Sequence, residues 1–228
     1  MVITASMTRT TRVLCSIIVL SGTAMAAAKP HVIAFGKSTQ VRWLAGADEN
    51  TPLELRVRAL YVDGKLREFT IGSPHEITER LFVVRRAFRV NDSLPDEAAQ
   101  RWLWQRGGWV LVDRVTGRIT PLNLPEFDPY RSVAGWYRNY VAYCGVSDEN
   151  QKLYAMVIEL GRRKPVLKKE LKDAVLDDKP DSACQPPIWE RQPARVSFEA
   201  TGNEKATYLI RGHSVDVVTD EEGKEGSE

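Results

Sequence analysis

The sequence predicts an all-β protein, and three features of the chain point to this class. Short runs of β-branched and aromatic residues recur along it, with Gly, Pro, Asn and Asp between them. Within residues 53–61 every second residue is apolar, which is the period of a strand with one buried face. Beyond residue 26 no segment shows the period of an amphipathic helix. We therefore expect an antiparallel meander, either propeller-like or a sandwich.

The first half of the chain is expected to hold short strands joined by tight turns. Strands are predicted at residues 31–35, 40–44 and 53–61, and one long strand or a bent pair at 81–90. The dipeptide Asp63-Gly64 marks a turn. A three-residue loop at 62–64 would pair Val57 with Phe69 on one apolar face, whereas a two-residue loop would place Phe69 on the opposite face. The pattern therefore favours the three-residue loop.

The second half centres on residues 102–160, the densest group of β-branched and aromatic residues in the chain. Further strands are predicted at 109–112, 119–122, 141–146, 153–160, 166–171, 195–200, 206–211 and 214–218. Residues 172–194 are rich in proline and poor in apolar residues. A long loop is expected there, and such a loop in a compact domain needs a tether.

The N-terminus is typical of a secretory signal peptide. Arg9 and Arg12 precede the apolar run 13–20, and Ala24 and Ala26 supply small residues for cleavage. Translation from Met1 or from Met7 would give an equally good signal. We expect a signal peptide at 1–26, a single β-rich domain at 27–218 and an acidic disordered tail at 219–228. No integral membrane segment is expected after cleavage, so the predicted location is periplasmic or secreted.

Cleavage after Ala26 would leave two cysteines, Cys144 and Cys184. An even number in an oxidising compartment predicts a disulfide, and Cys184 would then tether the long loop. The alternative is two separate buried thiols. Cleavage would also lower the formal charge from +2 to 0, because it removes two arginines and no acid. This balance lacks the basic excess of a nucleic-acid-binding protein, so no nucleic-acid partner is expected.

Two sequence patterns lie within residues 108–160. One strand ends in the pattern Asp-x-x-Thr-Gly, from Asp113 to Gly117, and the segment Ser-Asp-Glu-Asn-Gln-Lys-Leu-Tyr runs from Ser147 to Tyr154. These residues resemble the blades of Tol-type periplasmic β-propellers. The resemblance implies a propeller-like scaffold that makes protein contacts more often than it catalyses a reaction.

No recognised catalytic or metal-binding motif is present. Residues 31–38 end like a phosphate-binding loop, but His31 replaces the first glycine and strand-forming residues follow it. Residues 75–79 have one histidine of the zinc-protease pair, since Glu79 stands in place of the second. His31, His75 and His213 share no metal-ligand spacing, and no Gly-x-Ser-x-Gly elbow occurs. We therefore predict no catalytic residue, no metal and no cofactor.

Three groups of residues are candidates for binding. Trp102, Trp104 and Trp109 with Arg106 could form an aromatic platform for a sugar or peptide, or they could fill the core. Arg162, Arg163 and Lys164 form a basic turn, extended by Lys168, Lys169 and Lys172, and a second basic group comprises Arg80, Arg85, Arg86 and Arg89. Either basic group could meet a protein or an anionic envelope polymer, or could be an ordinary solvated surface.

The sequence thus favours an exported, non-catalytic, β-rich binding or interaction protein of the cell envelope. The alternative is a secreted hydrolase of glycans or cell wall whose carboxylates are dispersed in the sequence. Such an enzyme requires a cleft with two carboxyl groups about 5–9 Å apart. A third hypothesis, a stabilising subunit of a larger assembly, predicts a sizeable apolar surface patch.

Overall fold

A computed structural model confirms the all-β class. It describes residues 30–43, 53–95, 99–147, 152–172, 174, 179–202, 204–212 and 214–218. This part of the chain has no helix, and 59% of it forms strands. It therefore contains no helix that could cross a membrane. The predicted signal peptide and acidic tail lie outside the described residues.

The first half of the chain forms a seven-stranded sheet. Its strands are β1 (Ile33–Phe35), β2 (Thr39–Trp43), β3 (Leu53–Val62), β4 (Lys65–Glu76), β5 (Leu81–Asn91), β6 (Trp102–Asp113) and β7 (Ile119–Pro121). From β2 to β6 each strand pairs antiparallel with the next, as expected for a meander. A parallel pairing of Trp43 with Trp104 joins β2 to β6, so the five strands close into a ring.

The first sheet buries residues on both of its faces. On β5, Phe82 and Val84 belong to one apolar cluster and Ala87 to another. These positions differ in parity, and alternate side chains of a strand point to opposite faces. The same change occurs on β3 between Val57 and Leu60. β3 and β5 therefore each contribute to two apolar clusters, one on either face of the sheet.

The predicted three-residue loop between β3 and β4 is wrong. Val62 pairs with Lys65, so only Asp63 and Gly64 form the loop. Both residues have positive φ, 51° and 74°, as in the mirror-image turns whose twist suits a two-residue hairpin.

Phe69 nevertheless lies on the same face as Val57. Leu60 pairs with Glu68 and Tyr61 with Leu66, so one residue of β4, Arg67, has no partner on β3. This bulge shifts the register by one residue and brings Phe69 opposite Ala59. The one-residue shift that places Phe69 on the face of Val57 was predicted in the loop, but it occurs within β4.

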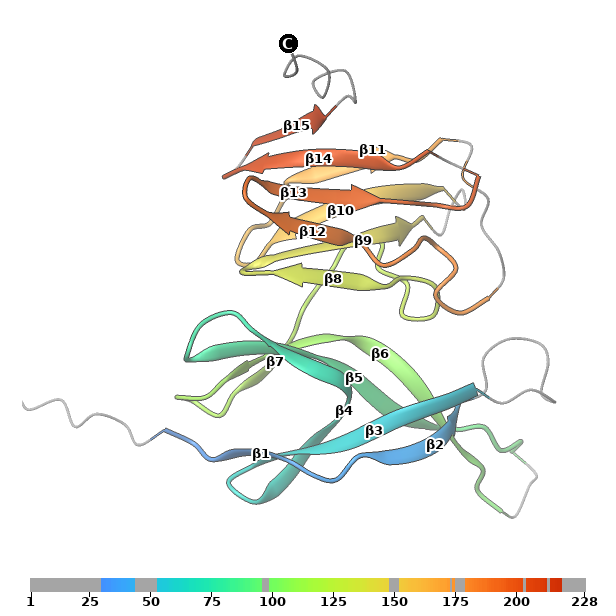
Figure 1. Cartoon of the computed structure of the whole chain (residues 1–228). Coiled ribbons are helices and arrows are strands. Elements are labelled where there is room, and N and C mark those ends of the chain that lie inside the picture. Colours follow the sequence, from blue (N-terminus) through green and yellow to red (C-terminus); the bar gives the residue numbers. More distant parts are fainter. Residues whose placement is uncertain are drawn as a thin grey trace, which may run out of the picture.

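The second half forms two four-stranded antiparallel sheets, which lie one against the other in Figure 1. The second sheet comprises β8 (Ala134–Tyr137), β9 (Tyr140–Val146), β10 (Leu153–Glu159) and β11 (Leu167–Glu170), and the third comprises β12 (Ile188–Arg191), β13 (Ala194–Phe198), β14 (Ala206–Arg211) and β15 (Ser214–Val218). The sequence did not predict β8 or β12, and β12 lies in the expected long loop. These two short strands meet through Tyr137, which stacks on Trp189, a contact with no local sequence signal.

The second sheet is covered on both faces. One face shares a core with the third sheet, in which Ala142 and Cys144 of β9 pack with Val196 and Phe198 of β13. On the other face, Val141 and Tyr143 join a cluster that includes Trp109 of β6. This cluster connects the first half of the chain to the second, and Figure 1 shows the first sheet below the other two.

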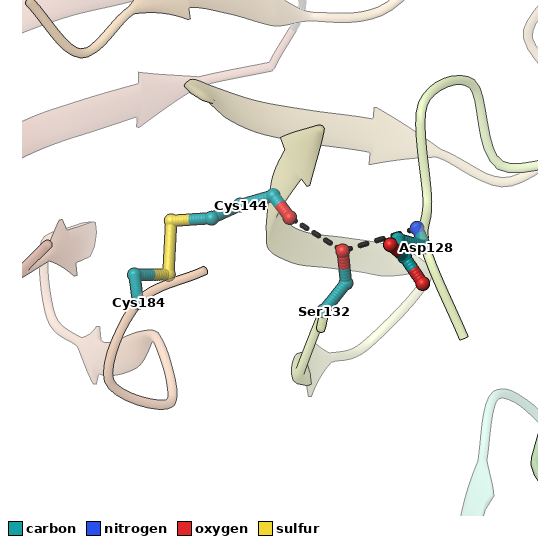
Figure 2. Close-up of a disulfide and its surroundings, with 4 residues drawn as sticks. All are labelled: Asp128, Ser132, Cys144 and Cys184. Atoms are coloured by element: carbon teal, nitrogen blue, oxygen red, sulfur yellow. Dashed lines mark hydrogen bonds between the residues drawn. A yellow bond between two sulfur atoms is a disulfide. The ribbon is translucent and has the colours of Figure 1, made fainter. Parts of the chain in front are cut away.

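The predicted disulfide is present between Cys144 and Cys184. Both cysteines are buried, and they tie the segment before β12 to the centre of the second sheet. Figure 2 shows a second attachment at the same point, where the hydroxyl of Ser132 donates a 2.7 Å hydrogen bond to the carbonyl oxygen of Cys144. The backbone N–H of Asp128 in turn donates to Ser132 Oγ at 3.1 Å. Cys144 therefore anchors two loops to one strand.

Removing the disulfide should destabilise the protein strongly. The bond closes a loop with a sequence separation of 40 residues, and a cross-link of this span stabilises by about 4 kcal/mol in the chain-entropy model. We expect the double variant Cys144→Ser, Cys184→Ser to lose about that much free energy of unfolding in urea titrations. Wild-type protein kept in reductant serves as the control and should lose a similar amount. Equal stability of the oxidised and reduced proteins would contradict this account.

Candidate anion-binding site

A cleft of about 350 Å³ lies where the first sheet meets the start of the second. Three arginines, Gly72 and Ser73 line it together with aliphatic and aromatic side chains. The arginines are Arg56, Arg85 and Arg106, and the apolar residues are Leu55, Ile71, Trp109, Val133 and Ala134. No aspartate or glutamate of the described residues lines it. We call it the arginine cleft.

A bulge in β6 brings Arg106 and Trp109 to the same side. These residues are three apart, so in a regular strand they would point to opposite faces. Arg85 pairs with Trp109 and Ala87 with Arg106, so β6 contains one more residue than β5 over this step. The extra residue falls at Gly107 and Gly108, as glycines within a strand often mark a bulge. Both side chains consequently line the cleft.

Glycine at position 107 also serves close packing. A Cβ atom there would lie 3.1 Å from Cβ of Arg86 and 3.4 Å from the ring of Phe88. Its carbonyl oxygen accepts a hydrogen bond from Arg85 Nε at 3.3 Å. The bulge thus allows the close approach of β5 and supplies one partner for the arginine in the cleft wall.

Arg85 is a buried cation that pairs with no carboxylate of the described residues. It is 8% exposed, and its Nη2 donates to the carbonyl oxygen of Pro129 at 2.5 Å. Its guanidinium also lies over the ring of Phe127, 5.6 Å from the centroid. Among the described residues no carboxylate lies within 4 Å of it. Burial, and then the charge of Arg106, lower the pKa of Arg85 to about 10, against a partial offset from Asp181 and Asp128. Arg85 is therefore still charged at neutral pH.

The side chain of Arg106 is also largely buried, but it has a counterion. Its side chain is 8% exposed, and Nη1 lies 2.8 Å from both carboxylate oxygens of Asp181. Its Nη2 donates to the carbonyl oxygen of Tyr130 at 2.7 Å, and its guanidinium stacks 4.0 Å from the ring centroid of Trp43. The backbone N–H of Asp181 donates to the same carbonyl of Tyr130. This ion pair connects β6 to the segment that Cys184 tethers.

One tight turn aims both carbonyl groups at the arginines. The Asp128 side chain accepts backbone hydrogen bonds from Tyr130 at 2.7 Å and Arg131 at 3.3 Å, the usual way in which aspartate stabilises a turn. The backbone N–H of Ser132 donates to the carbonyl of Asp128. Ser132 is hydrogen-bonded to the carbonyl oxygen of Cys144 (Figure 2). Strand β9, which carries the disulfide, therefore positions the carbonyls of Pro129 and Tyr130.

Two buried donors in the cleft residues have no acceptor. The Nε–H group of Arg106 and the indole N–H of Trp109 make no hydrogen bond to any of the described residues. Buried polar groups nearly always have a partner, and one left without it costs about 1–3 kcal/mol. Together with the unpaired charge of Arg85, they make the arginine cleft suited to an anion.

The structure divides the predicted aromatic platform. Trp109 and Arg106 line the arginine cleft, while Trp104 lines a second pocket of about 350 Å³ with Tyr61 and Phe69. Trp102 lines neither cavity and is 50% exposed. It does share a face with Trp104, as expected, because the Arg89 guanidinium lies 5.8 and 5.5 Å from their two rings.

The basic turn after β10 lies apart from both cavities. Arg162, Arg163 and Lys164 are exposed and line neither of them. Arg162 lies 3.7 Å from Glu159, and Lys168 pairs with Glu126 at 2.5 Å. Both hypotheses from the sequence therefore stay open for this turn, namely contact with an anionic partner or an ordinary solvated surface.

The arginines of β5 and its approach do not form one exposed basic group. Arg80 pairs with Asp113 at 2.5 Å, and this bond is the main cause of a pKa of Asp113 well below its usual range. Arg86 pairs with Glu68 at 3.1 Å, and Arg89 packs on tryptophan rings. Sequence reasoning placed Arg85 among them because charged residues are usually exposed. The signal that it missed is the glycine pair in β6.

The described histidines do not gather at a metal site. His31 Nδ1 contacts Asp63 Oδ2 at 2.5 Å, and His75 Nε2 lies 2.9 Å from the carbonyl oxygen of Arg138. His213 lies outside the described residues. Within the described part of the chain, no three His, Cys, Asp or Glu side chains group closely enough to hold a metal ion.

Comparison with protein-family models, with curated proteins and with solved structures found no match to this chain. The resemblance of residues 108–160 to Tol-type propeller blades stays a prediction from the sequence. The properties of the cleft have to be argued from its own residues.

The Asp181–Arg106 ion pair should stabilise the protein measurably. Arg106 is buried, so Asp181→Asn would leave its charge poorly compensated, and we expect a loss of about 1–2 kcal/mol in the free energy of unfolding by urea. The matched control is Asp92→Asn. Its partner Arg101 is 56% exposed, and exposed ion pairs contribute about 0–1 kcal/mol. Equal losses in the two variants would show that burial does not strengthen the Asp181 pair.

Proposed function

We propose that this chain is an exported, non-catalytic binding protein of the cell envelope, periplasmic or secreted, and that its arginine cleft binds an anionic group. The observation that carries the proposal is the pair of buried arginines, one of which has no carboxylate partner among the described residues. The charge and the apolar wall together are typical of a site that recognises a ligand by a few polar groups in an apolar cleft. The anionic group would belong to an anionic envelope polymer, a protein or a small molecule.

Binding is favoured over hydrolysis by the composition of the cavity walls. A glycosidase needs two carboxyl groups facing one cleft. Within the described part of the chain, neither the arginine cleft nor the pocket beside Trp104 has an aspartate or glutamate in its wall. Export is supported by the signal-like N-terminus and by the disulfide between Cys144 and Cys184, since such bonds persist in oxidising compartments.

Small anions should stabilise the folded protein by binding. A ligand present at ten times its dissociation constant adds about 1.4 kcal/mol, which raises the melting temperature by about 3–6 °C in a chain of this size. We expect acetate, phosphate or sulfate to produce a saturable rise in melting temperature, relative to chloride at the same ionic strength.

Two exposed arginines provide a matched pair of variants for this measurement. Arg56→Gln, in the cleft wall, should weaken the effect, whereas Arg67→Gln, which lines neither cavity, should not. No saturable shift with any anion, or equal shifts in both variants, would overturn the proposal.

Export predicts a shortened mature chain. Cleavage after Ala26 would make Ala27 the first residue. We expect N-terminal sequencing of the protein recovered from the extracytoplasmic fraction to start there, and Ala24→Arg with Ala26→Arg to leave the full-length chain uncleaved. A wild-type protein that keeps residues 1–26 and remains in the cytoplasm would contradict the proposed location.

A further inference from the structure

We infer that the arginine cleft selects a monocarboxylate attached to an apolar body, either a free aliphatic acid or the C-terminal carboxylate of a chain that ends in an apolar residue. This inference rests on the proposed anion binding and adds the class of ligand to it. Three properties of the cleft lead to it, namely its net charge, the arrangement of its free donors and the nature of its remaining wall.

The buried charge of the cleft calls for one negative charge. Of the two buried arginines, Arg106 is already neutralised by Asp181, which does not line the cleft. Among the described residues, Arg85 donates hydrogen bonds to the carbonyl oxygens of Gly107 and Pro129 and pairs with no carboxylate. A single negative charge would compensate Arg85, whereas a second one would be buried with only the exposed Arg56 to balance it. Unbalanced buried charge is strongly disfavoured, so a monoanion fits better than a dianion.

The free donors suit the two oxygens of a carboxylate. Arg85, Trp109 and Arg106 lie on one face, because Arg85 pairs with Trp109 and the neighbouring Ala87 pairs with Arg106. The indole N–H of Trp109 and the Nε–H of Arg106 have no acceptor among the described residues. A carboxylate can accept from several donors at once in one plane. Because both donor nitrogens are themselves covered, a carboxylate whose charge faces Arg85 would reach them through a shift of the side chains around them.

Apart from Gly72 and the hydroxyl of Ser73, the rest of the wall is apolar. Leu55, Ile71, Val133 and Ala134 line it together with the ring of Trp109. The volume of about 350 Å³ lies at the lower end of the range for small-molecule sites, about 300–1,000 Å³. The body next to the carboxylate should therefore be small and apolar, such as a short alkyl chain or a leucine side chain.

The test measures binding of five probes to the full-length protein at pH 7 by calorimetry. The probes are hexanoate, N-acetyl-leucine, N-acetyl-leucinamide, phenyl phosphate and acetate. We expect hexanoate or N-acetyl-leucine to bind at least about tenfold more tightly than acetate, phenyl phosphate and the uncharged amide, because only they combine one charge with an apolar body. Tighter binding of hexanoate would identify a free acid as the ligand, and tighter binding of N-acetyl-leucine a chain terminus.

Trp109→Phe tests the donor without removing the ring. Loss of one hydrogen bond to a charged group should weaken carboxylate binding about tenfold, while Arg67→Gln should leave it unchanged. In case Trp109→Phe does not fold, the indole N–H signal of Trp109 in wild-type NMR spectra provides a second measurement, and it should move downfield when hexanoate or N-acetyl-leucine is added.

The failures of the two proposals are distinguishable. Tighter binding of phenyl phosphate than of either carboxylate would overturn the monocarboxylate inference and leave anion binding in place. Equal binding of N-acetyl-leucine and its amide would also overturn the inference, because charge would then play no part. If no charged probe binds, both the inference and the proposed function fail.

Discussion

Two guanidinium groups buried beside each other are the constraint on which the rest of this structure depends. A buried charge is expensive unless it is paired and hydrogen-bonded. Arg106 meets this condition with Asp181 and the carbonyl of Tyr130, whereas the hydrogen bonds of Arg85 within the described part of the chain go to two carbonyl groups. The fold must therefore bring a turn from the middle of the chain, and an aspartate from a loop before β12, to the inner side of the first sheet.

The covalent and hydrogen-bonded attachments at Cys144 meet that requirement. The disulfide holds the segment that contains Asp181, and the bond from Ser132 holds the turn that presents Pro129 and Tyr130 (Figure 2). Both attachments converge on β9, a strand buried on both faces. A disturbance of β9 would thus reach the arginines through two short connections, which links the stability of the second sheet to the state of the cleft.

The cleft also illustrates a conflict between stability and binding. A charge held by neutral carbonyls, and two donors without acceptors, would be poor choices if the residues served the fold alone. Local departures of this kind from otherwise consistent packing are expected where a protein binds something. Apolar clusters cover both faces of the first and second sheets. Trp136 and Arg195, which do not line the cleft, also have a buried donor without an acceptor among the described residues, so the cleft is distinguished by the combination of such donors with the buried charge of Arg85.

The sequence by itself determined the all-β class, most of the strands and the disulfide. The strands follow from the spacing of apolar residues within short segments, and the disulfide follows from the even number of cysteines left after cleavage. It did not reveal β8 and β12, whose contact joins segments far apart in the chain. It also did not reveal the bulge at Arg67, which produces the register shift that the predicted three-residue loop was expected to produce. For the site, it selected Arg106 and Trp109 for their residue types but also Trp102 and the turn at 162–164. Only the tertiary structure decided that Arg85 is buried. The bulge at Gly107 and Gly108 and the turn at 128–132 each supply a carbonyl partner for Arg85, although both are distant from it in sequence. A charge is buried or exposed according to what packs over it, and no local pattern records that.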